Sequence, residues 1–146
     1  MSKSNARTQT LSRVKLFTSC TGKELDEVGR ITTEVRVRAG RVLCNEGAPG
    51  QECFVVVSGQ ACVTIAGEHV ATIEDGGFFG EMALLDGGPR VATVTAETDM
   101  VLLALTSAEF SSLLDRVPAV TRHMLASVGA RLRGADHKAH PSLVGI

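Results

Sequence analysis

The chain has 146 residues and 44% hydrophobic content, which fits one domain with its own apolar core. Its formal net charge of −1 gives no global positive field for a nucleic acid, and the absence of Trp and Tyr argues against stacking platforms for single strands. Residues 1–13 contain no apolar signal region, and no run approaches the ~20 apolar residues that span a bilayer. These features predict a cytoplasmic protein without a membrane partner.

The spacing of the cysteines gives little indication of disulfide bonds. Cys20, Cys44, Cys53 and Cys62 form no C-x-x-C pair, so in a chain without an export signal we expect reduced thiols. A zinc site that joins cysteines to His69 stays open as the weaker alternative, and the prediction is that the protein holds no metal and no cofactor.

Short apolar segments alternate with glycine turns through the first two thirds of the chain, and more follow. Predicted strands are Thr32–Arg38, Phe54–Val57, Ala61–Ile65, Val70–Ile73, Val91–Thr95 and Met100–Leu105. Short strands at this spacing indicate a β sandwich or closed barrel rather than βαβ units.

Helices flank this β body. Thr21 followed by Glu24 is a capping-box pattern for a helix over Lys23–Arg30, and Thr106 with Glu109 repeats it before a helix that ends near Asp115.

A final helix is predicted from Pro118, and Gly134 would end it. One apolar stripe runs along it: Val117, Val120, Met124, Val128 and Leu132. The stripe has three interpretations, namely packing on its own barrel, a dimer seam, or a lid over a ligand. We expect residues 1–10 and 135–146 to be flexible ends around a domain at 11–134.

The segment from Asp75 to Arg90 interrupts the series of predicted short strands. Glycines before a short run of helix formers place unpaired N–H groups at a helix start, which favours an anion, and Gly80 would let a ligand approach the backbone. A Gly-Gly-Pro turn then brings Arg90 to the start of an apolar strand, where its charge needs an anionic partner. That partner is either Glu81, in a structural ion pair, or a ligand phosphate, in which case Glu81 can accept a hydrogen bond from a sugar hydroxyl.

Two runs in this segment, Phe79–Leu85 and Pro89–Val94, closely resemble the phosphate-binding cassette of cyclic nucleotide-binding domains. Such domains occur in cAMP-dependent kinase regulatory subunits, gated channels and catabolite-activator-type regulators. Glycine-spaced positions upstream fit the same family: Glu46-Gly47, Gly50, Phe54, Val56 and Gly59. The resemblance covers roughly Leu16–Arg133. It implies a mainly β fold, an eight-stranded β jelly-roll barrel with N-terminal helices and a C-terminal helix pair.

The resemblance also implies a site. Glu81 matches the glutamate that binds the ribose 2′-hydroxyl, Arg90 matches the arginine that pairs with the cyclic phosphate, and Val91 has no hydroxyl for guanine, which favours cAMP over cGMP. The last helix would cap the base, although Ala135 and Asp136 replace a Thr-Ser pair found in bacterial activators. The candidate ligand-binding residues are Phe79, Gly80, Glu81, Met82, Ala83, Pro89, Arg90, Val91, Thr93, Arg131, Leu132 and Arg133.

Other functions fit less well. The 12 residues after Gly134 are too few for a helix-turn-helix, so we expect no direct nucleic acid binding. The four histidines form no cupin-like cluster, and no G-x-S-x-G is present, so we expect no catalysis. The sequence therefore predicts a cyclic nucleotide sensor that signals to an unidentified effector protein through its C-terminal helix, with a homodimer through that helix left open. The alternatives are a degenerate jelly-roll module for protein interaction or dimerisation, and a ligand-binding fragment of a larger transcription regulator or channel.

Overall fold

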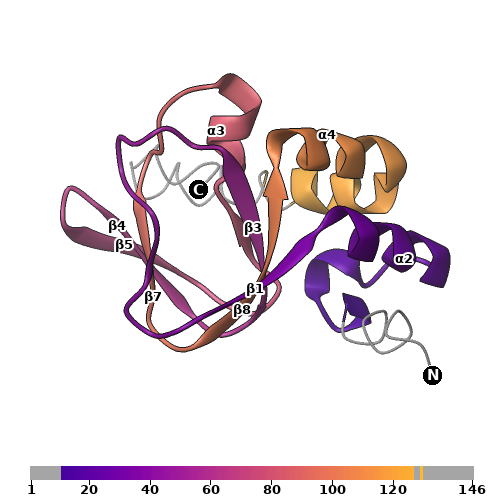
Figure 1. Cartoon of the computed structure of the whole chain (residues 1–146), viewed down its shortest axis with the longest axis horizontal. Helices are drawn as coiled ribbons and strands as arrows, with labels where there is room; N and C mark the ends of the chain where they lie inside the picture. Colours follow the sequence, from indigo (N-terminus) through magenta and orange to yellow (C-terminus); the bar gives the residue numbers. More distant parts are fainter. Residues whose placement is uncertain (1–10, 127–128, 130–146) are drawn as a thin grey trace.

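Two antiparallel four-stranded sheets form the body of the molecule, and helices cover one side of it (Figure 1). The computed structural model describes residues 11–126 and residue 129. The strands are β1 (Thr33–Val37), β2 (Val42–Cys44), β3 (Glu52–Ser58), β4 (Ala61–Ile65), β5 (Glu68–Ile73), β6 (Phe78–Phe79), β7 (Thr93–Ala96) and β8 (Met100–Thr106). One sheet has the order β1-β8-β3-β6 and the other β2-β7-β4-β5. The prediction of an eight-stranded jelly roll is confirmed.

Two features of the β body differ from the prediction. The strand expected from Val91 begins only at Thr93, because residues 91 and 92 bend before β7 joins its ladder. Arg90 therefore precedes the strand instead of opening it. The short strands β2 and β6 were missed, since three and two residues are too few to show an alternating pattern.

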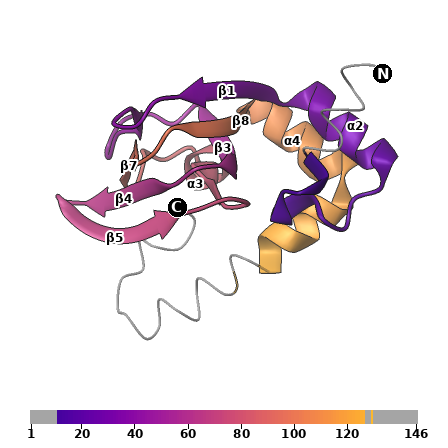
Figure 2. The ribbon, with the colours of Figure 1, turned by 90° about the horizontal axis from the view of Figure 1, so that it is seen from below.

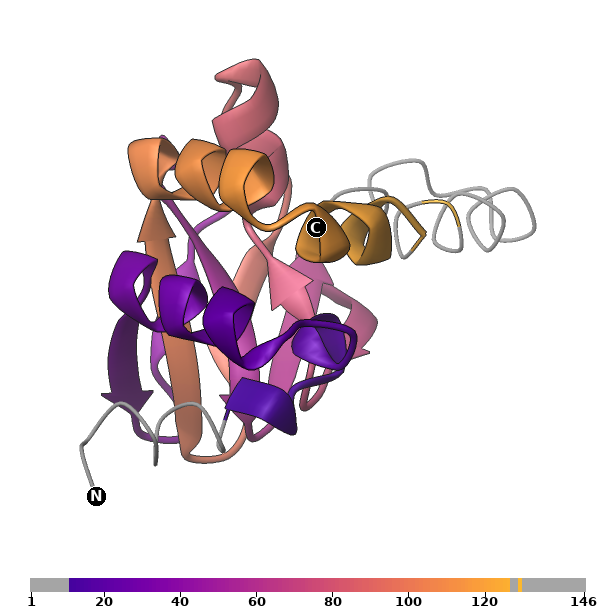
Figure 3. The ribbon, with the colours of Figure 1, turned by 90° about the vertical axis from the view of Figure 1, so that its right-hand side faces the viewer.

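The helices begin where their capping residues predict. The described helices with defined bounds are η1 (Lys15–Phe17), α2 (Gly22–Ile31), α3 (Glu81–Asp86) and α4 (Ser107–Arg116), and residues 118–126 form a further helix. Thr21 caps α2 and Thr106 caps α4, each with its reciprocal glutamate bond. Figure 3 shows α2 and α4 side by side over the same face of the β body. The predicted C-terminal helix pair is present as α4 and the helix over residues 118–126. No described helix is long and apolar enough to cross a membrane.

The central parts of β3 and β8 are buried on both faces of their sheet, which explains the continuous apolar runs in these two strands. Cys53 and Val55 of β3 face a core shared with the helices, which we call the helical core. Phe54 and Val56 face a second core between the two sheets, the barrel core. Figure 2 shows α2 and α4 together beside the ends of β1 and β8, away from the hairpin of β4 and β5.

The apolar stripe of the last helix packs within its own domain over its described part. Val117, Val120 and Met124 are all buried in the helical core. The packing interpretation is confirmed for these three residues, whereas Val128 and Leu132 lie outside the described residues. Leu125, on the same helix, is 66% exposed.

Candidate functional site

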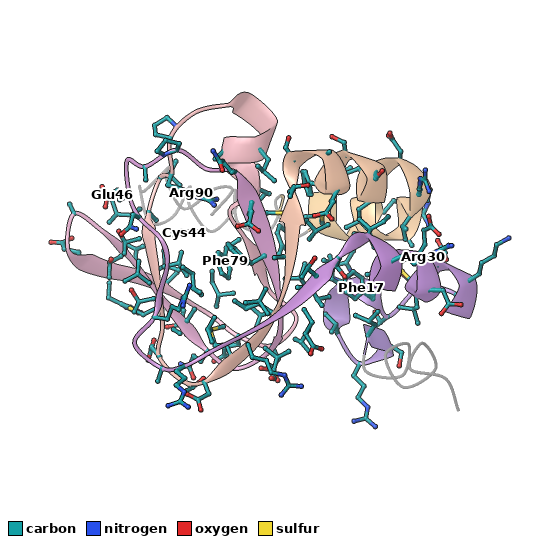
Figure 4. All side chains as sticks on the ribbon, viewed as in Figure 1. Phe17, Arg30, Cys44, Glu46, Phe79 and Arg90 are labelled. Carbon is teal, nitrogen blue, oxygen red and sulfur yellow. The ribbon has the colours of Figure 1, made fainter. Side chains whose placement is uncertain are left out.

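The backbone of Arg90 is held by the loop that follows β2, the strand that pairs with β7. Its N–H donates to the carbonyl of Ala48 at 2.8 Å, and its own carbonyl accepts from the N–H of Gly47 at 2.8 Å. Pro49 and Pro89 form an antiparallel bridge beside these bonds. The loop after β2 therefore fixes the backbone of Arg90, and Figure 4 shows the side chain pointing inward near Cys44 and Phe79.

The Arg90 guanidinium is buried without a carboxylate. The residue is 9% exposed, and its Nη1 and Nη2 atoms donate to the carbonyl oxygens of Gly80 at 3.1 Å and Glu52 at 2.7 Å. Among the described residues, the arginines that form ion pairs with carboxylates are Arg30, Arg36 and Arg116. The hydrogen bonds that the described part of the chain shows for this guanidinium go to backbone carbonyls, and its positive charge can attract an anion.

Two glycines make room for this arginine. Gly80 has φ +89°, and a Cβ on it would lie 2.7 Å from Nη1 of Arg90 and 3.1 Å from the Glu52 carbonyl oxygen. On Gly50, a Cβ would lie 2.4 Å from the Cβ of Ala83 and 3.0 Å from Nε of Arg90. The space into which a Cβ of residue 80 would point is thus occupied by the guanidinium. Gly50 carries a role that the sequence motif did not disclose.

Glu81 opens helix α3 directly after the carbonyl that Arg90 holds. The N-cap of α3 is Gly80, which has no side chain to cap the helix. Glu81 is the acidic residue in the first turn of α3. Its side chain is only 3% exposed, so its carboxylate lies inside the domain. A carboxylate oxygen can accept a hydrogen bond from a hydroxyl group.

Two cysteine thiols border the site and stay protonated. Burial, opposed by the Arg90 charge and reinforced by those of Glu81 and Glu52, raises the pKa of Cys44 to about 11. Burial, with the Glu81 charge next, raises the pKa of Cys53 to about 12. Both cysteines are free, as predicted, and neither is a nucleophile at neutral pH.

The remaining candidate residues occupy different environments. Phe79 is fully buried, and its ring stacks on Phe54 with centroids 5.2 Å apart. Ala83 is buried, and Val91 packs against the barrel core. Pro89 is exposed, and the Thr93 hydroxyl accepts a hydrogen bond from the Glu46 N–H. Of Met82 the structure describes only the backbone. The three candidates in the last helix, Arg131, Leu132 and Arg133, lie outside the described residues.

Glu46 ties the loop around Arg90 to a distant hairpin. Its carboxylate accepts the N–H of Ala66 at 2.9 Å, at the turn between β4 and β5, and its own N–H donates to the Thr93 hydroxyl at 3.1 Å. These bonds cross between strands far apart in sequence. They explain structurally why a glutamate precedes Gly47, which the resemblance had given only as a pattern.

A separate cavity of about 430 Å³ lies at the other end of β3. It is lined by Gly59, Gln60, Glu74, Asp75 and Thr98. Asp75 accepts the Gly59 N–H at 2.8 Å. The lining residues that the structure describes include two acidic side chains and no cation, so they would repel a phosphate, unlike the surroundings of Arg90.

Comparison with known proteins agrees with this geometry. The sequence model of the cyclic nucleotide-binding domain matches residues 34–117. A cyclic nucleotide-gated potassium channel of Mesorhizobium japonicum is 40% identical over 112 residues, which are 77% of this chain and 31% of the channel. A cAMP-dependent protein kinase regulatory subunit of Hypocrea atroviridis is 32% identical over 77% of this chain and 24% of its own length.

The fold has solved counterparts as well. The crystal structure of the Thermus thermophilus catabolite activator protein has 32% sequence identity and a TM-score of 0.75, over 85% of this chain and 61% of that one. The present chain spans less than a third of the length of the channel and of the kinase subunit. On the family match and the shared fold, this chain belongs to the cyclic nucleotide-binding domain family.

Proposed function

We propose that the domain binds a 3′,5′-cyclic nucleotide, cAMP in preference to cGMP, beside Arg90 and the start of α3. The carrying observation is the buried Arg90 guanidinium, which contacts two carbonyls and no carboxylate of the described residues. A guanidinium has five N–H donors, so two bonds leave donors for a phosphate oxygen. The single negative charge of a cyclic phosphate matches this one arginine.

Glu81 gives the sugar a partner close to the phosphate. Glu81 lies in the first turn of α3, and its carboxylate can accept a hydrogen bond from the ribose 2′-hydroxyl. Arg90 holds the carbonyl of Gly80, which directly precedes Glu81 in the chain. The phosphate and sugar contacts therefore belong to one connected unit, as the cassette resemblance implies.

The preference for cAMP rests on Val91. This half-buried aliphatic side chain packs against the barrel core and offers no hydroxyl to guanine. The cap over the base remains a prediction for Arg131, Leu132 and Arg133. The Hypocrea atroviridis kinase subunit, cAMP-dependent by name, supports the same preference.

We assign the ligand a regulatory role without catalysis, in which an unidentified effector reads the C-terminal helix. Helix α3 supports this route because Ala83 lies against Gly50 beside Arg90, while Leu84 packs on the helical core. Val117 and Val120 belong to that same core. Homodimerisation through the last helix, a ligand-free interaction module and a ligand-binding part of a larger regulator or channel remain the competing assignments.

Calorimetric titration of the chain with cAMP and with cGMP tests the proposal. The Arg90→Ala variant should lose about 2–5 kcal/mol of binding free energy, the cost of removing one partner from a desolvated charge pair. Arg36→Ala is the matched control, since that side chain is 77% exposed and pairs only with Glu34. Saturation with cAMP at 100 times its dissociation constant should also stabilise the fold by about 2.7 kcal/mol.

The outcomes separate the competing assignments. If neither nucleotide binds the unaltered chain at millimolar concentration, the nucleotide site is refuted and the interaction module is favoured. If Arg90→Ala stays folded by circular dichroism and binds cAMP normally, the phosphate lies elsewhere. Tighter binding of cGMP than of cAMP would refute the inference from Val91.

A further inference from the structure

Three side chains with different metal-binding chemistry meet on the outer face of the sheet β2-β7-β4-β5. Cys62 lies on β4, His69 on β5 and Glu97 directly after β7, and one ligand atom of each lies within 4.8 Å of the others. Figure 1 shows β4 and β5 together beside β7. None of the three belongs to the candidate nucleotide site.

A β-bulge brings His69 to this face. Cys62 pairs with Thr72 on β5, and its neighbour Val63 pairs with Ala71 and is fully buried, so Cys62 faces outward. The register then skips a residue, and Thr64 pairs with His69. Because directly paired residues share a face, the skip places His69 on the side of Cys62.

His69 is also oriented by a neighbouring side chain. Its Nε2 atom lies 3.1 Å from the hydroxyl of Thr72, which leaves Nδ1 for a metal. Metal-binding histidines commonly use their second ring nitrogen in such a bond, which fixes the tautomer and the ring direction. The cluster therefore includes a supporting contact as well as three ligand atoms.

We propose that Cys62, His69 and Glu97 bind a zinc ion, with water as the fourth ligand. A thiolate, an imidazole and a carboxylate match the preferences of Zn²⁺, whereas Ca²⁺ and Mg²⁺ prefer oxygen ligands alone. Zn–S bonds of about 2.3 Å and Zn–N bonds of about 2.0 Å require ligand atoms somewhat closer than the 4.8 Å limit. His69 and Glu97 are exposed and can turn inward, and the thiol proton of Cys62 passes to the buffer on binding.

Cobalt titration of the full chain tests the site, because Co²⁺ bound to a thiolate shows a charge-transfer absorption band. The titration uses a chain that carries His137→Gln and His140→Gln, so that these two histidines cannot bind cobalt. In this background Cys62→Ser should abolish the band, and His69→Gln or Glu97→Gln should weaken cobalt affinity about tenfold or more, with zinc displacing cobalt throughout. Cys20→Ser is the matched control, since Cys20 is the other half-buried free thiol.

A band that survives Cys62→Ser, or that Cys20→Ser abolishes, would overturn the site, and so would the absence of any band. A measurement without variants guards against misfolding. Zinc should protect Cys62, and not Cys20, from alkylation followed by peptide mass spectrometry, and equal rates with and without zinc would also refute the proposal. The cAMP titration is a separate readout, so either proposal can fail alone.

Discussion

Replacement of Gly50 by alanine should disturb the proposed nucleotide site although Arg90 and Glu81 themselves are unchanged. The new methyl would lie 2.4 Å from the Cβ of Ala83, whereas two carbon atoms pack best at about 3.5–4.0 Å. Ala83 is fixed to the backbone of α3, so the helix or the loop must move by about 1 Å. Overpacking of this kind costs about 1–3 kcal/mol of folding stability.

The same methyl would press on the arginine. It would lie 3.0 Å from Nε and 3.1 Å from Cζ of Arg90, so the guanidinium must shift away from the positions in which it bonds to Gly80 and Glu52. A hydrogen bond to a charged group contributes about 1.5–3 kcal/mol, so misplacing this group should weaken cAMP affinity about 10- to 100-fold.

Urea unfolding and calorimetry, run on the same preparations, measure the two effects. Gly22→Ala is the control, because a Cβ there meets no atom within 4 Å and the backbone is not left-handed. That variant should keep its affinity and gain up to about 1 kcal/mol of stability. If Gly50→Ala matches the unaltered chain in both stability and cAMP affinity, the contact between α3 and the loop at Gly50 does not position Arg90.

Two further predictions concern stability alone. Thr106→Ala removes the acceptor of the Glu109 N–H at the start of α4 and should lower the free energy of unfolding in urea by about 1 kcal/mol. Ser107→Ala is the control and should lower it less; equal losses of stability would refute the capping assignment. The thiols of Cys44 and Cys53 have pKa values raised from 9.0 to about 11 and 12, so the unfolded chain releases these protons first and the free energy of unfolding should fall as pH rises above about 9. Urea unfolding between pH 8 and pH 10 should show this fall, with a shallower slope in Cys53→Ala; an unchanged slope would contradict the assignment.

Local signals predicted the capping residues of α2 and α4, and the predicted start of α2 at Lys23 lies one residue after the observed start at Gly22. The Thr21 and Thr106 capping boxes need only residues three positions apart, so their chemistry is complete in the sequence. The strands β3 and β8 were predictable because their central residues are apolar and buried on both faces. The bend at residues 91 and 92 was not, since it follows from bonds between Arg90 and the loop at Gly47 and Ala48.

The contacts of the candidate site were also predictable only in part. Sequence reasoning required an anionic partner for Arg90, and it offered Glu81 as the structural choice. The actual protein contacts are backbone carbonyls, one of them 38 residues away in Glu52, and no side-chain pattern encodes a carbonyl. Gly50 and the group of Cys62 with His69 also depend on approaches between distant segments, one of them created by a bulge.

Helix α3 links the two cores through adjacent residues. Ala83 lies against the loop at Gly50, and Leu84 packs on the helical core that holds Val117 and Val120. Arg90 donates a hydrogen bond to the carbonyl of Gly80, the N-cap of α3. A phosphate that draws the guanidinium toward itself must weaken that bond, and a ligand shifts an equilibrium only by such differences in contact between two states. Because a close-packed core yields little, a displaced Leu84 would move the start of the last helix, which gives the proposed ligand a physical route to an effector.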